Sequence, residues 1–152
     1  MIRLNYRIRQ EVSSATDKYR TSLAIEAVPL AMQYEISVER EFVRAELYDR
    51  QTAEETREFF ERVVSSAERH LRHRVLIFVH SSKALFTIER TGFFTQFARL
   101  SRDPAHKVAL LGDTEELGIS HQYVEVLGRQ HRINVKNFDH EAEALRWLRG
   151  DH

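Results

Sequence analysis

A run of five apolar residues near the middle of the chain, Val75 to Val79, limits the folds open to this sequence more than any other feature. It reads Val-Leu-Ile-Phe-Val, and an unbroken β-branched and aromatic run is typical of a parallel strand buried on both faces. Burying five such side chains contributes about 10 kcal/mol, since each adds roughly 1.5–3 kcal/mol. That sum is comparable to the net stability of a whole small domain. The sequence therefore predicts a sheet built around this strand.

The composition excludes several classes of protein. A chain of 152 residues suits one domain, and its 23 basic residues balance 23 acidic ones, so the footprint of a nucleic-acid binder is missing. Cysteine is absent, which rules out disulfides, a thiolate nucleophile and a cysteine zinc site. No apolar run approaches the ~20 residues that span a bilayer. We expect a cytoplasmic protein with no membrane span and no nucleic-acid partner.

The first 31 residues differ in character from the rest. Ile2, Leu4, Tyr6 and Ile8 alternate with polar residues, a period of two that suits a strand, and a polar stretch then begins at Ser13. We therefore divide the chain into an N-terminal extension or arm, 1–31, and a domain proper, 32–152. The extension is either a loosely attached tail or an arm that adds to a sheet edge.

The domain opens with a predicted hairpin and a helix. Alternating apolar residues over 34–38 and 43–47 indicate two half-buried strands joined by a short polar turn. Thr52 followed by Glu55 is a capping box, in which the two side chains satisfy free amides at a helix start. Apolar residues then recur at helical spacing to about His70.

Strands and helices alternate over the remainder. Residues 84–102 are helical in part, with Ser82 and Thr91 both suited to cap the start, and Lys107 to Gly112 is a second buried strand. A helix over 119–132 carries Ile119, Tyr123, Val126 and Leu127 on one face; a strand over 134–138 and a helix over 140–149 follow. The order β-β-α-β-α-β-α-β-α predicts an α/β fold, a mostly parallel sheet of about five strands with about four helices.

This order resembles the STAS domain, closest to the SpoIIAA-like branch of the anti-sigma-factor antagonists, which is related to CRAL-TRIO-type lipid-binding domains. The local similarity is clearest in Lys107-Val-Ala-Leu-Leu-Gly-Asp113, in Arg132-Ile-Asn-Val-Lys-Asn-Phe138 and in Glu141-Ala-Glu-Ala-Leu-Arg-Trp-Leu148. It covers about four-fifths of the chain and rests on structural motifs, so it speaks to the fold more than to function.

The resemblance implies one candidate modification site. Regulatory STAS domains carry a phosphorylatable Ser or Thr just after the third strand, at the start of the second helix. Ser81 and Ser82 stand at that place, so both are candidate phosphoacceptors. A phosphate there would add about two negative charges, which a helix N-terminus and Lys83 would stabilise. His80 stands where the family usually has Asp, and no Gly follows before Gly92. Both serines equally suit an ordinary capping role in a strand–helix turn.

Four phenylalanines within twelve residues are the second candidate site. They could line a pocket for an acyl chain or another small apolar ligand, as the CRAL-TRIO kinship implies, or form the core face of a helix: Phe86, Phe93, Phe94 and Phe97. Neighbours 93 and 94 subtend about 100° on a helix, so both cannot point at the centre of one narrow stripe.

No catalytic motif accompanies these residues. The chain has no Gly-x-Ser-x-Gly, no phosphate-cradling loop, no dinucleotide fingerprint and no His-Glu-x-x-His, so we expect no enzyme, no metal and no cofactor. We expect instead a STAS-like regulatory module that acts through protein binding or switching, with a binder of an apolar or lipid-like ligand as the alternative. We also expect a homodimer, formed through the sheet side or the arm. The identity of the protein partner is not contained in the sequence.

Overall fold

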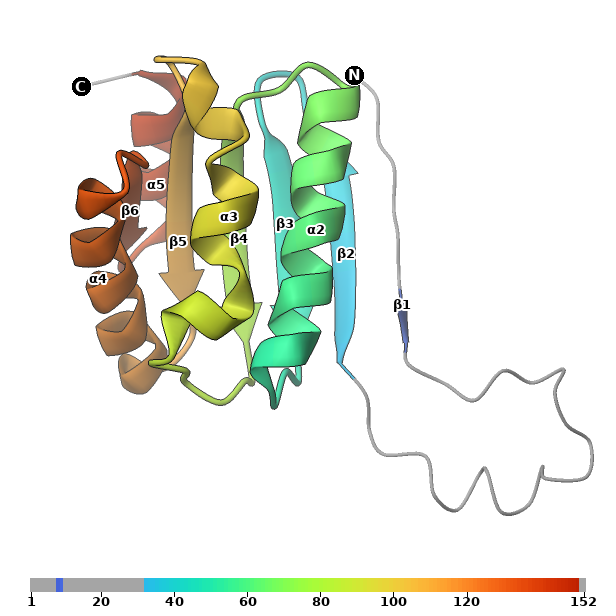
Figure 1. Cartoon of the computed structure of the whole chain (residues 1–152), viewed down its shortest axis with the longest axis vertical. Coiled ribbons are helices and arrows are strands. Elements are labelled where there is room, and N and C mark those ends of the chain that lie inside the picture. The colour runs from blue at the N-terminus through green and yellow to red at the C-terminus, as the bar shows by residue number, and fades with distance from the viewer. Residues whose placement is uncertain (1–7, 10–31, 151–152) are drawn as a thin grey trace, which may run out of the picture.

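A six-stranded sheet with helices on both faces makes up the structure, a computed structural model that describes residues 8–9 and 32–150 (Figure 1). The strands lie side by side in chain order: β1 (Ile8–Arg9), β2 (Gln33–Val38), β3 (Val43–Tyr48), β4 (Arg74–His80), β5 (Lys107–Gly112) and β6 (Val135–Phe138). Pairing is parallel from β3 to β6 and antiparallel between β2 and β3. The predicted α/β class, the mostly parallel sheet and the order of elements are confirmed.

The hairpin and the first helix form as the sequence predicts. Glu39 donates its backbone N–H to the carbonyl of Phe42 at 2.8 Å and closes the turn between β2 and β3. Helix α2 (Ala53–Arg69) begins after Thr52, whose hydroxyl accepts the N–H of Glu55 at 3.1 Å, while the Glu55 carboxylate accepts the N–H of Thr52 at 3.0 Å. This reciprocal cap fixes the helix start directly after β3.

Three helices cover one face of the sheet and one covers the other. Because every parallel strand is added on the same side of its predecessor, right-handed crossovers place the connecting helices together. Figure 1 shows α2, α3 (Phe93–Phe97) and α4 (Glu115–Gln130) in front of the sheet, with α5 (Glu141–Arg149) behind it. Helix α5 packs on β4 and β5 and buries Ala144 and Leu148 against Leu76. Helix α5 therefore shields the second face of the central strand, β4.

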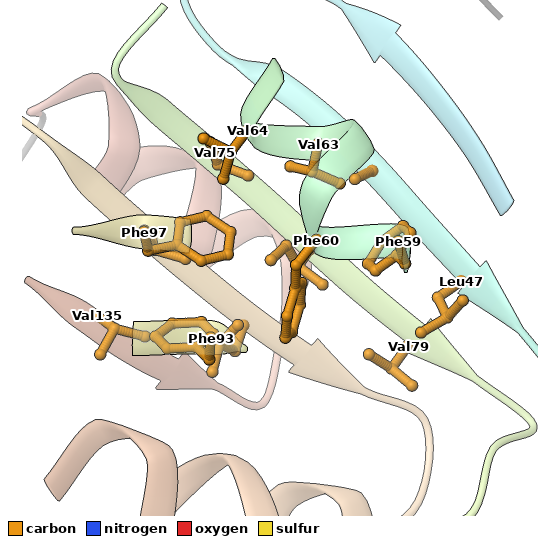
Figure 2. Close-up of a cluster of buried hydrophobic side chains, with 14 of the residues drawn as sticks. Leu47, Phe59, Phe60, Val63, Val64, Val75, Val79, Phe93, Phe97 and Val135 are labelled. Carbon is orange, nitrogen blue, oxygen red and sulfur yellow. The ribbon is translucent and has the colours of Figure 1, made fainter. Parts of the chain in front are cut away.

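The larger core lies between the sheet and the three front helices. Alternate residues of β4, Val75, Ile77 and Val79, point into it. Figure 2 shows the aromatic centre of this core, where Phe60 meets both Phe93 and Phe97 edge to face at 5.4 Å between ring centroids. Such ring pairs add to the stabilisation from burial alone.

The segment after β4 is helical only in part, as the sequence predicts. The chain forms a loop at residues 81–87, then a 3-10 helix, η2 (Ile88–Thr91), the five-residue α3, and a second 3-10 helix, η3 (Leu100–Arg102). Gly92 separates η2 from α3 with a φ of 76°, in the left-handed region that glycine adopts without strain. Short pieces therefore replace one continuous helix.

Helix α4 does not contact the sheet through the whole of the apolar stripe that the sequence predicts for it. Its face toward the sheet is made of Leu117, Ser120, His121, Val124 and Gly128. A Cβ atom on Gly128 would lie 2.3 Å from Val135 Cγ1, so the missing side chain lets the helix approach β6 closely. Of the apolar stripe predicted for this helix, Leu127 packs against the core, whereas Ile119, Tyr123 and Val126 face outward and are each about half exposed.

One short part of the N-terminal extension falls within the described residues. Strand β1 pairs antiparallel with β2, and Ile8 lies opposite Tyr34. This pairing is what an arm added to a sheet edge would make. The rest of the predicted alternating strand, including Ile2, Leu4 and Tyr6, lies outside the described residues.

Candidate functional site

The carboxyl ends of β3, β4 and β5 meet at one edge of the sheet, where open α/β sheets usually place their sites. Arg50 follows β3, the two serines follow β4, and Gly112 ends β5. The backbone of Arg50 holds the next loop in place, because its carbonyl accepts the N–H of Lys83 at 3.0 Å. The segments that follow β3 and β4 are therefore joined at this edge of the sheet.

The family resemblance implies a serine at the start of a helix. Neither Ser81 nor Ser82 lies at a helix N-terminus, so this expectation was wrong. Ser81 is exposed, has a φ of 47°, and donates its N–H to the Asp113 carboxylate at 3.0 Å. The Ser82 hydroxyl accepts the N–H of Arg50 at 3.0 Å and donates to the His80 carbonyl at 2.8 Å. Ser82 thus ties the ends of β3 and β4 together, and a phosphate on Ser81 would lie beside an existing negative charge.

The four phenylalanines divide into two pairs. Phe93 and Phe97 are buried and stack at 4.6 Å, so they form core, as the alternative interpretation held. Phe94 is partly buried and stacks on the His131 ring at 3.9 Å, and Phe86 is 52% exposed beside Tyr123. The sequence argument that residues 93 and 94 cannot share one narrow stripe is consistent with this division.

A small cavity lies beneath the loop that follows β4. Its volume is about 30 Å³, and its walls come from β3, β4, β5, α2, the loop, η2, α3 and α4. Most of the lining is apolar and includes Phe60, Ile77 and Phe93. Five polar side chains interrupt it: Arg50, Thr56, Thr91, Ser120 and His121.

Arg50 is the charged group of this cavity and is only 5% exposed. Its Nη1 donates to Thr56 Oγ1 at 3.2 Å, and its Nη2 donates to the Lys83 carbonyl. The Nε atom is buried without a hydrogen-bond partner. Burial lowers the pKa of the guanidinium to about 10, with a smaller opposing effect of the Glu55 charge. A pKa near 10 still keeps the group positively charged at neutral pH.

His121 faces the same cavity from α4 and is 7% exposed. Burial, together with the nearby charge of Arg50, lowers the pKa of the imidazole to about 3, so the ring is neutral at physiological pH. Its Nδ1 atom is buried without a hydrogen-bond partner. Two nitrogens without hydrogen-bond partners, Arg50 Nε and His121 Nδ1, therefore belong to side chains that line the same cavity.

Sequence reasoning missed both of these residues. Arg50 stands in a short polar stretch between a strand and a helix cap, a place where arginine is usually exposed. His121 lies outside the apolar stripe of α4, and the stripe was the visible signal. The one available clue was position, because Arg50 comes just after a strand and at the edge where parallel strands end.

A second polar cluster lies on the other face of the sheet. The His80 ring stacks between Tyr48 and Phe78, at 4.7 and 4.0 Å, and its Nε2 lies 2.9 Å from Glu46 Oε1. Burial alone would raise the pKa of Glu46, but the hydrogen bond from His80 and the charge of Arg44 outweigh it and lower the pKa. This cluster is internally paired, unlike the cavity around Arg50.

Two further searches concern metals and membranes. In the described part of the chain, no three His, Asp or Glu side chains come together as a metal ion would require. None of the helices formed by residues 32–150 has the length and apolar character needed to cross a bilayer.

The fold and site define a small α/β module with an open, mostly parallel sheet. Comparison of the chain with models of protein families, with curated proteins and with solved structures finds no match.

Proposed function

We propose that this chain is a non-catalytic STAS-like module that acts through protein contact, and that its contact surface is the outward side of α4. We call this surface the α4 face; its members are Phe86, Ile119, Tyr123 and Val126. The observation that carries the proposal is the orientation of α4, which leaves Ile119, Tyr123 and Val126 about half exposed while Leu117 and Val124 face the sheet.

The α4 face is a contiguous strip. Ile119, Tyr123 and Val126 are spaced by four and three residues, so they follow one another along one side of the helix. Phe86 adds to it from the loop after β4, with its ring centroid 6.5 Å from that of Tyr123. The four side chains are 43–52% exposed. Aromatic and aliphatic residues gathered in this way are typical of the centre of a protein interface.

A second copy of the same chain is the occupant that the charges favour. Glu115 and Glu116 are exposed at the start of α4, and Arg129 and Arg132 are exposed at its end. If two copies pack their α4 helices antiparallel about a twofold axis near Tyr123, each acidic end meets the other copy's basic end. The apolar strip then meets itself, as an isologous interface requires. The acidic and basic ends would form the charged rim around this apolar centre.

This surface differs from those expected from the sequence. The side of the sheet that Leu76 faces is covered by α5, and the edge of β2 pairs with β1. Both expected surfaces therefore have partners within the chain at those points. Phosphorylation of Ser81 or Ser82, a bound acyl chain beside the phenylalanines and a cytoplasmic location stay predictions from the sequence.

The experiment is sedimentation velocity of the full chain over a range of concentrations. We expect a reversible dimer that Tyr123→Asp converts to a monomer, because a carboxylate would be buried at the centre of the interface. The matched control is Leu71→Asp, since Leu71 is 85% exposed and lies beyond the end of α2, away from the α4 face. A wild-type monomer at all concentrations would refute the proposed occupant, as would a dimer that Tyr123→Asp leaves intact.

Charge reversal tests the antiparallel arrangement. One variant carries lysine at positions 115 and 116, and the other carries glutamate at positions 129 and 132. Each alone would bring like charges together at both ends of the interface and should associate less than the wild type. An equimolar mixture should restore association, because each reversed end then meets an opposite charge. Equal association of the single variants and the mixture would contradict this arrangement.

A further inference from the structure

We propose that the cavity beneath the loop after β4 is a binding site for one small monovalent anion, held by the guanidinium of Arg50 and the imidazole of His121. This site is separate from the α4 face and does not depend on it. The two residues come from distant parts of the chain, the end of β3 and the middle of α4.

The first argument is an unbalanced charge. Arg50 is buried, and among the residues that the structure describes no Asp or Glu carboxylate forms an ion pair with it. Glu55 contributes some attraction, but its carboxylate is already engaged by the backbone N–H groups of Gln51 and Thr52, at 2.6 and 3.0 Å. A buried charge without a counter-ion costs several kcal/mol. An anion in the cavity would remove that cost.

The second argument is hydrogen bonding. Arg50 Nε and His121 Nδ1 are buried without partners, although neighbouring groups of the same cavity are satisfied. Thr56, for example, accepts from Arg50 and donates to the Thr52 carbonyl at 3.1 Å. Arg50 Nε always carries a hydrogen, and a neutral imidazole with its proton on Nδ1 offers a second donor. Arg50 thus has a donor without a partner, and His121 supplies a second one in that tautomer, which suits an anion.

The third argument is size and surroundings. The volume of about 30 Å³ fits an occupant the size of one water molecule or a halide ion. Apolar walls, including Ile77 and Phe93, lower the local dielectric and strengthen the attraction between the guanidinium and an anion. The loop at residues 81–87 forms part of the wall, through Leu85, so its movement would admit a slightly larger group such as formate.

The test uses the full chain, sodium chloride and sodium formate as probes, and a bulky sulfonate as the balancing anion at constant ionic strength. We expect the Arg50 Nε–H signal in ¹⁵N NMR to shift saturably with at least one probe, and the melting temperature to rise with the same midpoint. His121→Leu should weaken the binding about tenfold, the equivalent of one hydrogen bond to a charge.

Arg50→Met separates a binding site from a merely structural arginine. The variant keeps the backbone bonds of residue 50 and removes a buried unpaired charge, so it should fold and melt at or above the wild-type temperature in sulfonate buffer. It should not respond to chloride or formate. Arg90→Met is the control, since Arg90 is exposed and pairs with Glu54, and it should respond as the wild type does.

The probes also distinguish the kind of anion. A response to chloride alone supports a halide-sized site, and a response to formate alone supports a carboxylate site; a response to both supports a general anion site. If neither probe shifts the Arg50 Nε–H signal, or if Arg50→Met responds like the wild type, the proposal is wrong and the cavity holds water only.

Discussion

The buried imidazole of His121 predicts a specific loss of stability in mild acid. The folded protein holds this pKa at about 3, against an ordinary value of 6.5, chiefly because the ring is buried and secondarily because Arg50 lies near it. From the other elements that border the cavity, Thr56 and Thr91 face it with uncharged hydroxyls. Between pH 6.5 and about 3 the unfolded chain therefore binds one more proton at this position than the folded chain does.

The sign and size follow from proton linkage. Since the unfolded state binds more protons, the free energy of unfolding rises with pH across this window and falls as the solution is acidified. At pH 5, about 1.5 units below the ordinary pKa, the extra proton bound by the unfolded chain lowers the free energy of unfolding by about 2 kcal/mol. The effect would reach about 5 kcal/mol near pH 3, comparable to the net stability of many domains.

Urea unfolding at pH 7.5, 6 and 5 measures this loss directly. We expect wild-type protein to lose about 2 kcal/mol more than His121→Gln between pH 7.5 and 5, because the variant lacks the titrating ring. His140→Gln, at an exposed position, is the control and should lose as much as the wild type. Should His121→Gln fail to fold, the ring signals of wild-type His121 in NMR should stay constant over the same range. Equal pH dependence in all three proteins, or ring signals that titrate near pH 6, would refute the argument.

Two further predictions concern particular backbone positions. Gly112→Ala should lower the free energy of unfolding by about 1–3 kcal/mol, since its Cβ would lie 2.6 Å from the nearest side-chain carbon of α4. Gly118 lies within α4, and a Cβ atom there would meet nothing within 4 Å. Gly118→Ala should therefore raise the free energy of unfolding by about 0.5–1 kcal/mol. Urea unfolding that gave the two glycine variants changes of the same sign would contradict this. Ser81→Asp should melt below Ser81→Asn at low salt, because the new carboxylate lies close to Asp113, and the gap should narrow in high salt. A gap that salt leaves unchanged would exclude charge repulsion as its cause.

The strands and the first helix were predictable because local signals and packing agree in them. Four of the five residues of the Val75–Val79 run are buried, all but Phe78, and Thr52 with Glu55 forms the reciprocal cap of α2. Each of these features depends on residues close in sequence or on a periodicity of two. Their boundaries in the structure differ from the predicted ones by only a few residues.

The orientation of α4 could not be predicted from its apolar pattern. The stripe containing Tyr123 is apolar, yet the side of the helix that lies close to the sheet is the one that carries Gly128. How near a helix comes to a strand depends on the absence of a side chain on one partner and the shape of the other. Those two facts belong to different elements, here Gly128 of α4 and Val135 of β6, and neither is part of the apolar pattern of the helix.

The candidate site was hidden for a related reason. Burial of Arg50 and His121 arises where the ends of three strands, the loop after β4 and α4 come together, and no short motif encodes that meeting. The serines were visible because they follow a strong strand, but the chain continues into a loop and 3-10 helix instead of a helix start. Position at the sheet edge was therefore predictable, and the chemistry at that edge was not.

The order of the strands has a consequence for how the molecule forms during synthesis. From β2 onward each strand pairs with the one made just before it, so each new strand finds a partner that has already been made. Contacts close in sequence form quickly, because the chain entropy lost in closing each loop is small. The hairpin of β2 and β3 can therefore act as a template on which β4, β5 and β6 are laid down in turn. Helix α5 arrives last, and its docking on β4 and β5 completes the second face of the sheet.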